Sequence, residues 1–251
     1  MSDRLTGTTT LVTGAGSGIG ARVAVRFAQE GARSIFSDRD LAAAQAAAAE
    51  HENAIAVQLD ITDEASVERA FADCAERGWA PNVVVANAGV QLFGQDAPVA
   101  DLDLDVWRRT IEVNLTGTFL TLKYAVRTML AGSGGSIIVT GSPTGLNGEG
   151  RDFTAYSSSK AGMHGMARAV ANAYADRGIR VNTVVPGYTE TPLVTAISGN
   201  PEDRAAIVSR IPLGRPGRPE DVDGIMVYLA SDESSYATGA IFRVDGGMTT
   251  L

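Results

Sequence analysis

The stretch TTLVTGAGSGIG, residues 9–20, decides the fold. Thr9–Thr13 is rich in β-branched residues, which is typical of a strand, and Ile19, Val23 and Phe27 then recur at helical spacing. A glycine-rich turn lets the backbone approach a pyrophosphate closely, and the free N–H groups at the start of a helix attract an anion. A glycine cluster alone is equally typical of an ordinary tight turn. This cluster follows a strand and opens a helix, which is the context that a dinucleotide site requires.

Short apolar runs and longer helical patterns alternate along the rest of the chain. Further strands are predicted at residues 34–37, 55–59, 83–86, 137–140, 181–185 and 241–244, and helices between them near 41–50, 64–77, 103–129 and 156–176. Strands that alternate with helices form parallel sheets with helices on both faces. The sequence therefore predicts an α/β fold, a Rossmann-type doubly wound sheet of seven parallel strands in one domain over residues 1–251. Residues 193–218 are polar and proline-containing, and we expect them to form a small substrate lid.

The composition narrows the choice of partners. The 251 residues carry a net charge of −8 at pH 7, which argues against nucleic acid and anionic membrane surfaces as general partners. No apolar run is long enough to span a membrane, and the first ten residues lack the apolar core of a signal peptide, so we expect a cytoplasmic protein. The single cysteine, Cys74, excludes an intramolecular disulfide, and His51 and His164 stand in no ligand pattern, so we expect no metal.

An acidic residue stands at the end of the second predicted strand. Asp38 follows Gly20 by 18 residues, where an acid can accept hydrogen bonds from an adenosine ribose. Its charge would repel a 2′-phosphate and so favours NAD over NADP, although the adjacent Arg39 could meet such a phosphate. Asp38 could instead cap the next helix, a position that Asp40 could equally fill.

The ends of the third and fourth predicted strands face the same crevice. Asp60 could receive the adenine amino group, and Ile61 could pack on the ring. Asn87, Ala88 and Gly89 give a small turn beneath a cofactor. Each of these residues also has an ordinary explanation as part of a loop.

The pair Tyr156 and Lys160, in YSSSK, stands four residues apart and so lies one turn apart on one face of a predicted helix. A tyrosine with its ordinary pKa of about 10 is a poor base at neutral pH. A neighbouring ammonium stabilises the phenolate and lowers that pKa, so the pair can exchange a proton near the working pH. Such pairs are common on surface helices, and the nucleotide motifs upstream are what make this one a candidate active site.

Together these motifs resemble the classical short-chain dehydrogenase/reductase family. The resemblance covers essentially the whole chain and depends on TGAGSGIG (13–20), Asp60, NAG (87–89), Asn114, Ser142, YSSSK (156–160), PG (186–187) and VDGG (244–247). It implies that Tyr156 is the general acid/base and that Lys160 lowers the Tyr156 pKa and binds the nicotinamide ribose. It implies that Ser142 hydrogen-bonds the substrate oxygen. Asn114 lies in a predicted helix, although asparagine is a poor helix former. The resemblance implies that it holds a water in a proton relay.

The resemblance also implies a cofactor site and an assembly. The cofactor is NAD, and the residues implied are Gly14, Ser17, Gly18, Ile19, Asp38, Asp60, Ile61, Asn87, Ala88, Gly89, Tyr156, Lys160, Pro186, Gly187, Thr189 and Thr191. The implied assembly is a homotetramer.

The chain departs from the family pattern at the substrate end. Ser142 precedes Tyr156 by 14 residues, one more than is common. Position 143 is Pro143, which cannot do the chemistry, so Ser142 remains the candidate, with Thr144 as a competitor.

The loop between Ser142 and Tyr156 carries Arg151, a charged residue beside a site that is often apolar. A guanidinium can grip a carboxylate bidentately, which makes Arg151 a candidate substrate residue together with Ser142 and Tyr156. Arg204 or Arg210 on the expected lid could close on the same group. The plainer alternative is that Arg151 pairs with a neighbouring acid or points into water.

The sequence thus predicts an NAD-dependent oxidoreductase that interconverts a secondary alcohol and a ketone, with a sugar, polyol or hydroxy acid as its small-molecule substrate. One alternative is a 3-oxoacyl-carrier-protein ketoreductase, which would prefer NADPH and need a basic docking patch. Asp38 and the net charge of −8 speak against both requirements. A non-catalytic dinucleotide-binding module is the other alternative, and the complete set of four active-site residues speaks against it.

Overall fold

Parallel strands form the centre of the molecule, which a computed structural model describes over residues 3–194 and 200–250. The described strands are β1 (Thr9–Thr13), β2 (Arg33–Asp38), β3 (Ala54–Gln58), β4 (Val83–Ala86), β5 (Gly135–Thr140), β6 (Ile179–Pro186) and β7 (Ile241–Val244). They form one seven-stranded sheet in the order β3-β2-β1-β4-β5-β6-β7, and every pair is parallel. The order reverses direction between β1 and β4, so the predicted doubly wound sheet is confirmed.

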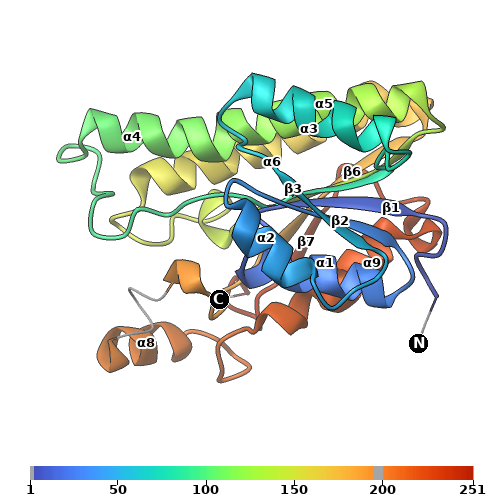
Figure 1. The fold of residues 1–251 in the computed structure, drawn as a ribbon. Helices are drawn as coiled ribbons and strands as arrows, with labels where there is room; N and C mark the ends of the chain where they lie inside the picture. The colour runs from blue at the N-terminus through green and yellow to red at the C-terminus, as the bar shows by residue number, and fades with distance from the viewer. Residues whose placement is uncertain (1–2, 195–199, 251) are drawn as a thin grey trace.

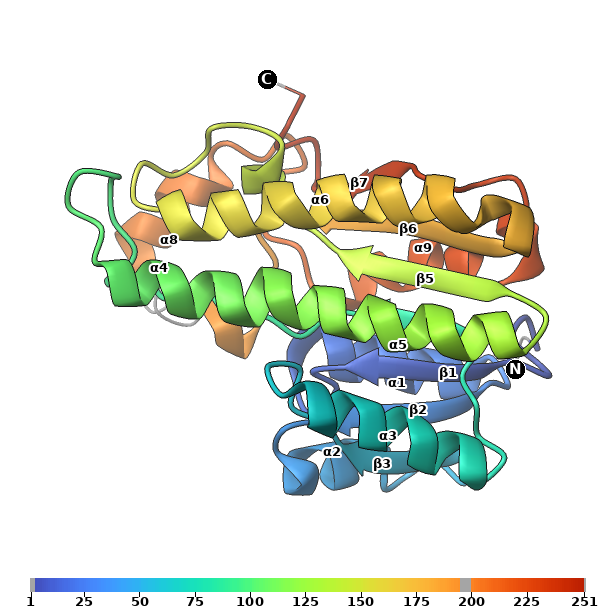
Figure 2. The ribbon, with the colours of Figure 1, turned by 90° about the horizontal axis from the view of Figure 1, so that it is seen from above.

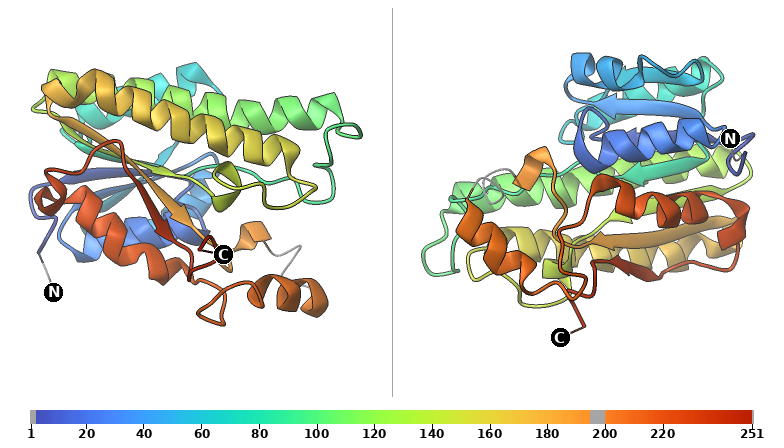
Figure 3. Two further views of the ribbon diagram at one scale, coloured as in Figure 1. Left: turned by 180° about the vertical axis from the view of Figure 1, so that it is seen from behind. Right: turned by 90° about the horizontal axis from the view of Figure 1, so that it is seen from below.

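Helices cover both faces of this sheet (Figure 1). They are α1 (Gly18–Gln29), α2 (Leu41–Ala48), α3 (Glu64–Glu76), α4 (Leu104–Ile111), α5 (Gly117–Ala131), α6 (Thr154–Tyr174), α8 (Pro201–Val208) and α9 (Asp223–Ala230). On one face α3, α5 and α6 lie across the sheet, as the view from above shows (Figure 2). On the other face α1 and α9 lie side by side, seen from below on the right of Figure 3.

The alternation of side chains along each strand divides the apolar core between these two faces. Val84 of β4 packs into the core beneath α3, α5 and α6, whereas its neighbours Val83 and Val85 pack into the core beneath α1, α2 and α9. All residues of β1 and β4 are buried. Two-sided burial is what a parallel sheet imposes, and it explains why β4 is a continuous apolar run, VVVA, rather than an alternating one.

The predicted helix 103–129 is interrupted. Residues Glu112–Thr116 form a π-helical turn between α4 and α5, and Asn114 lies in its middle. A π turn holds one residue more than the α-helical turn, and such turns are frequent at functional sites. The single helix expected here is therefore wrong in detail, because the apolar pattern continues through the extra residue.

Of the segment 193–218, which was expected to leave the sheet, the described residues lie outside its seven strands. They include a short 3₁₀ turn, Pro192–Val194, and helix α8, whose first turn is capped by the side chain of Asn200. Residues 195–199 of the expected lid lie outside the described residues. Across the described chain, no helix is both long and apolar enough to cross a lipid bilayer.

Candidate active site

A large pocket opens at the carboxyl ends of the strands, with a volume of about 920 Å³. That volume lies in the range of small-molecule and cofactor sites. All sixteen residues that the sequence assigned to the cofactor line it, as do Ser142 and Thr144. The sheet explains this gathering, because the carboxyl ends of β1, β2, β4, β5 and β6 meet at one edge.

The glycine-rich turn after β1 has the shape of a cradle for a dinucleotide. Gly14 has φ +67°, and a Cβ there would lie 3.0 Å from the Cα of Ala88. A Cβ at Gly20 would lie 2.2 Å from the carbonyl oxygen of Gly14. Helix α1 begins at Gly18, and Ser17 makes no side-chain cap, so the N–H groups of the first turn are available to an anion. These residues fit a pyrophosphate, because the glycine backbone can come close to it and the free N–H groups can donate hydrogen bonds to it.

Asp38 lies beside this turn at the end of β2. Its Oδ2 accepts the N–H of Gly16 at 3.0 Å, and its Oδ1 accepts the N–H of Asp40 at 3.0 Å. The cap of α2 is Asp40, whose Oδ1 accepts the N–H of Ala43. The alternative that Asp38 caps this helix is therefore excluded, and its carboxylate stands in the pocket wall next to Arg39.

Asp60, at the end of β3, also lines the pocket. Its Oδ1 accepts the N–H of Thr62 at 2.9 Å and the hydroxyl of Thr62 at 2.7 Å. These two hydrogen bonds lower the pKa of Asp60, so its carboxylate is charged at neutral pH. The loop after β3 thus presents a fixed acceptor next to Ile61.

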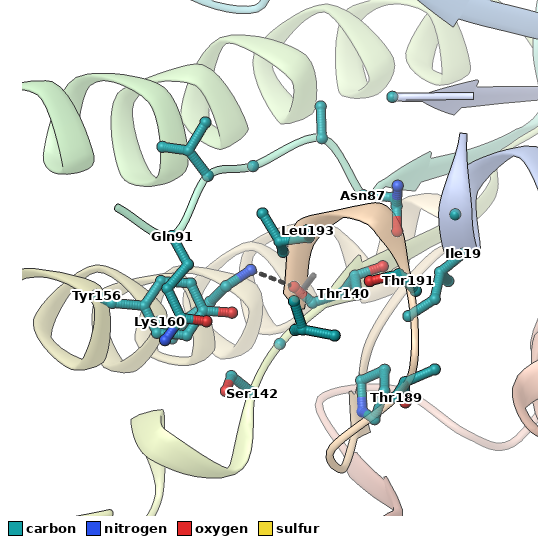
Figure 4. Close-up of a pocket in the computed structure, with 18 of the residues that line it drawn as sticks. Ile19, Asn87, Gln91, Thr140, Ser142, Tyr156, Lys160, Thr189, Thr191 and Leu193 are labelled. Atoms are coloured by element: carbon teal, nitrogen blue, oxygen red, sulfur yellow. Dashed lines mark hydrogen bonds between the residues drawn. The ribbon is translucent and has the colours of Figure 1, made fainter. Parts of the chain in front are cut away.

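Helix α6 carries Tyr156 and Lys160, which line the same pocket as Ser142, two residues after β5 (Figure 4). The ammonium of Lys160 donates to the carbonyl oxygen of Thr140 at 2.9 Å and lies 5.6 Å from the centre of the Tyr156 ring. Burial lowers the pKa of Lys160 to about 8. The same burial raises the pKa of Tyr156 to about 12, against the opposing effect of its hydrogen bond with the Ser142 side chain.

Burial is the larger effect on Tyr156, so the net pKa of its phenol lies above the ordinary value. The expected role of Lys160, whose ammonium would favour the phenolate, stays a prediction. The phenol is therefore protonated at neutral pH, which suits proton donation to a ketone. Proton acceptance from an alcohol requires the phenolate, which becomes more abundant as the pH rises.

The extra residue between Ser142 and Tyr156 is accommodated in a 3₁₀ turn, Pro143–Gly145, that Ser142 caps. Thr144 lies within this turn. Its hydroxyl is 3.0 Å from Ser142 Oγ, and its N–H donates to the same oxygen at 3.3 Å. The Ser142 side chain, and not that of Thr144, lowers the pKa of Tyr156 against the effect of burial. This difference favours Ser142 over Thr144, and the role of Ser142 stays a prediction.

Asn114 lies behind the pocket and does not line it. Its side chain is fully buried. Oδ1 accepts the N–H of Val90 at 2.7 Å, and Nδ2 donates to the Val90 carbonyl at 2.9 Å and to Ser159 Oγ at 3.1 Å. The π turn thus aims Asn114 at both the loop after β4 and helix α6. The Asn114 side-chain amide is thus hydrogen-bonded both to the loop after β4 and to helix α6. Its expected role in a proton relay stays a prediction.

The substrate end of the pocket differs from the expectation. Arg151 is exposed and is not among the lining residues. Arg204 is also absent from the lining, and it pairs with Glu190 at 2.6 Å. Arg210 does line the pocket, and its Nη2 lies 3.7 Å from Oε2 of Glu149. Of the three arginines considered, the structure brings Arg210 to the site.

Several lining residues escaped the sequence analysis. The rings of Phe93 and Phe153 meet edge to face, with centroids 5.8 Å apart. The other unassigned side chains around them include Gln91, Arg109, Glu112, Tyr188, Leu193, Val194, Ile207 and Met248. They come from loops and helix ends that no motif marks, although Tyr188 directly follows the Pro186–Gly187 pair. Among the described residues, no three histidine, cysteine or carboxylate side chains are grouped so as to hold a metal ion.

Comparison with known proteins places this geometry in a family. A family model described as enoyl-(acyl carrier protein) reductase matches residues 14–249. The chain is 42% identical to a cis-4-hydroxycyclohexanecarboxylate dehydrogenase of Sinomonas cyclohexanicum, over 96% of both chains. It is 35% identical to a cyclohexanol dehydrogenase of Acinetobacter sp., over 100% of this chain and 98% of that one.

A solved structure agrees with these relatives. The gluconate 5-dehydrogenase of Burkholderia cenocepacia, in complex with NADP and tartrate, superposes with a TM-score of 0.93 at 30% identity, covering 99% of this chain and 98% of that one. The chain therefore belongs to the classical short-chain dehydrogenase/reductase family, and it is an oxidoreductase that acts on secondary alcohols with a nicotinamide dinucleotide cofactor.

Proposed function

We propose that this enzyme oxidises the secondary alcohol of a hydroxy acid with NAD, and that Arg210 binds the carboxylate of the substrate. The observation that carries the proposal is the layout of the pocket. Ser142, Tyr156 and Lys160 line it, and so does Arg210, which lies beside Glu149.

The catalytic roles follow from Ser142, Tyr156 and Lys160. A bound nicotinamide dinucleotide supplies the acceptor for the hydride that leaves the alcohol carbon. The Tyr156 phenolate takes the hydroxyl proton, and the Ser142 hydroxyl hydrogen-bonds the same oxygen as it becomes a carbonyl. Lys160, held by Thr140 at 2.9 Å, keeps a positive charge 5.6 Å from the Tyr156 ring below its pKa of about 8. That charge favours the phenolate.

The choice of NAD depends on Asp38. Its carboxylate is fixed by two backbone N–H groups in the wall of the pocket. A 2′-phosphate in the same place would meet a negative charge without a hydrogen to share, whereas ribose hydroxyls could donate to it. Arg39, which also lines the pocket, is the one neighbour that would favour a phosphate.

A hydroxy acid suits the pocket wall that contains Arg210. The ion pair of Arg210 with Glu149 is long, at 3.7 Å, so a substrate carboxylate can replace Glu149 as the partner of the guanidinium. Phe93, Phe153 and Ile207 offer apolar surface next to it, which suits a carbon ring better than a polyol. The 42% identical relative is named for a hydroxylated cyclohexanecarboxylate, and the solved neighbour was obtained with tartrate, a dicarboxylate.

The test compares two alcohols that differ by the carboxylate: cyclohexanol and cis-4-hydroxycyclohexanecarboxylate. A charge-assisted bond of about 1.5–3 kcal/mol predicts that the acid has a kcat/KM roughly tenfold to a hundredfold above that of cyclohexanol. Arg210→Gln is expected to abolish this preference and to leave cyclohexanol turnover unchanged. Arg151→Gln, which alters an exposed arginine of the neighbouring loop, is the matched control and should change neither value. If the parent and Arg210→Gln prefer the acid over cyclohexanol to the same degree, the proposal is contradicted.

The alternative of a carrier-protein ketoreductase is not better supported. It would use NADPH, which Asp38 disfavours, and a carrier protein needs a basic patch that a net charge of −8 does not favour. The family model that matches is described by a carrier-protein substrate, and a 37% identical relative of Thermotoga maritima is named a 3-oxoacyl-carrier-protein reductase, whereas the 42% and 35% identical relatives are named for free alcohols.

We also propose that the enzyme is a homotetramer. Leu104 on α4 and Phe119 on α5 are large apolar side chains, and they are 56% and 50% exposed. Their helices lie one after the other along the same face of the molecule (Figure 2). Burial of such side chains against a second copy would remove them from water. Light scattering at micromolar concentration tests the assembly.

A further inference from the structure

His164 is a buried titratable side chain that the roles above do not use. It lies on α6, one helical turn after Lys160 and two turns after Tyr156, and its side chain is 2% exposed. Its Nε2 accepts the backbone N–H of Ser142 at 3.4 Å. The helix that carries the proposed acid/base therefore also contacts the segment that carries its serine partner.

The segment around Ser142 is shaped to the imidazole ring. A Cβ at Gly141 would lie 2.3 Å from Nε2 of His164, and a Cβ at Gly145 would lie 2.9 Å from Cε1. Glycine on each side of the Ser142 turn thus makes room for the ring. The imidazole is enclosed by the residues before and after Ser142, so any shift of the ring would move the turn.

The protonation state of His164 is compatible with Nε2 accepting a hydrogen bond. Burial, followed by the charges of Lys160 and Arg168, lowers its pKa to about 4, against a smaller opposing effect of the Gly145 backbone. The imidazole is therefore neutral at neutral pH. Because Nε2 accepts from Ser142, the proton of the ring is on Nδ1.

The same ring carries a cost to folding that an apolar side chain would avoid. Among the described residues, Nδ1 of His164 is buried and has no hydrogen-bond partner. An unsatisfied polar atom in the interior is unfavourable, and a leucine of similar size would not carry one. The unpaired Nδ1 is thus a cost of this histidine, whereas the bond that its Nε2 accepts from Ser142 is one that a leucine could not make.

We propose that His164 is a positioning residue, whose neutral imidazole holds the backbone N–H of Ser142 and thereby fixes the Ser142 hydroxyl against Tyr156. The inference rests on the proposed roles of Ser142 and Tyr156. It adds that the correct place of Ser142 is set from α6, the helix that also places Tyr156 and Lys160. Helix α6 would thus position all three of Ser142, Tyr156 and Lys160 relative to one another.

The experiment compares His164→Leu, which removes the acceptor, with His164→Gln, whose side-chain oxygen can reach the position of Nε2. Cyclohexanol serves as substrate, so that the result does not depend on Arg210. We expect His164→Leu to lower kcat by about tenfold or more, because misplacement of a reacting group is costly, and to leave the KM for NAD unchanged. His164→Gln should recover most of kcat. The midpoint of thermal unfolding should change little in His164→Leu, because the variant loses the unpaired Nδ1 but leaves the buried Ser142 N–H without its acceptor.

Further measurements separate the possible failures. A kcat of His164→Leu within threefold of the parent would overturn the positioning role, as would equal losses of kcat in the Leu and Gln variants accompanied by a lower unfolding midpoint. If His164→Leu does not fold, His164→Met, with its adaptable side chain, takes its place in the same comparison. Ser142→Ala is measured alongside: unchanged turnover in that variant would refute the proposed role of Ser142 itself, whereas a large loss there with an unchanged His164→Leu would refute only the inference about His164.

Discussion

The ammonium of Lys160 is bound to the carbonyl oxygen of Thr140, at 2.9 Å, and this bond ties the helix of the proposed acid/base to the end of the central strand β5. Lys160 is 4% exposed, so the charge that it carries is held in place and poorly screened by water. A fixed positive charge one turn after Tyr156 favours loss of the Tyr156 proton, whereas burial of the ring opposes that loss.

The pH dependence of the two reaction directions should therefore differ. Alcohol oxidation needs the Tyr156 phenolate, and the pKa of about 12 keeps it scarce at neutral pH, so the oxidation rate should rise as the pH increases from 6 to 8. Above the Lys160 pKa of about 8 the ammonium is lost and the rise should become shallower. Ketone reduction uses the protonated phenol and should be nearly flat from pH 6 to 8. Steady-state kcat in both directions tests this, and an oxidation rate that falls over this range would contradict it.

Removal of the phenol hydroxyl should abolish turnover and spare cofactor binding. Tyr156→Phe should lose about 10²-fold to 10⁴-fold in kcat, the contribution of general acid–base catalysis. The affinity for NAD, measured by fluorescence titration, should stay within about threefold, since the ring remains. Lys160→Ala should lower both kcat and the affinity for NAD, because its ammonium would stabilise the phenolate and bind the nicotinamide ribose. Tyr236→Phe alters a fully exposed tyrosine and is the matched control.

The carboxylate of Asp38 should set the choice between the two dinucleotides. We expect NAD to be preferred over NADP by at least a hundredfold in kcat/KM, on the order of 3 kcal/mol. Asp38→Ala should narrow this ratio, because it should lower the kcat/KM for NAD and raise the kcat/KM for NADP. Asp40→Ala, which removes the cap of α2 two residues away, should cost about 1 kcal/mol of stability but leave the ratio unchanged. Equal use of both cofactors by the parent would refute the role given to Asp38.

Acid should destabilise the fold in part through His164. Its pKa of about 4 in the folded state lies below the ordinary 6.5, so the unfolded chain takes up a proton first as the pH falls. The associated stability is present above pH 6.5 and is lost as the pH falls through about 4, with an upper limit of about 3 kcal/mol. Urea unfolding of the parent and of His164→Leu between pH 4 and 8 isolates this contribution. Parallel curves for the two proteins would show that His164 does not titrate in this way.

The sheet could be predicted because burial on both faces leaves a strong mark in the sequence. Thr9–Thr13, Val83–Ala86 and Ile241–Val244 begin and end at the predicted residues. The pocket residues at the strand ends followed from the same pattern, since a parallel sheet gathers its carboxyl ends at one edge. The π turn at Glu112–Thr116 could not be predicted, because one extra residue leaves the apolar pattern nearly unchanged.

The substrate end of the pocket could not be predicted because its residues come from segments without periodicity. Arg151 is five residues from Tyr156 in the sequence, yet its loop turns it towards solvent. Arg210 is 54 residues away in the sequence, and the path of the chain after α8 brings it into the pocket wall. Proximity in the chain was thus a poor guide where no strand or helix fixes direction. The raised pKa of Tyr156 likewise depends on how deeply the ring is buried, which the YSSSK spacing does not reveal.

The π turn between α4 and α5 acts as a phase shift in the longest helical stretch of the molecule. Each residue of an α-helix advances the direction of the next side chain by about 100°. The extra residue in Glu112–Thr116 therefore offsets the faces of α5 from those of α4 by that angle. Deletion of one residue, such as Val113, would restore an uninterrupted helix and turn Asn114 away from Val90, or else rotate the buried face of α5 out of the core. This stretch should tolerate substitution far better than any change in its length.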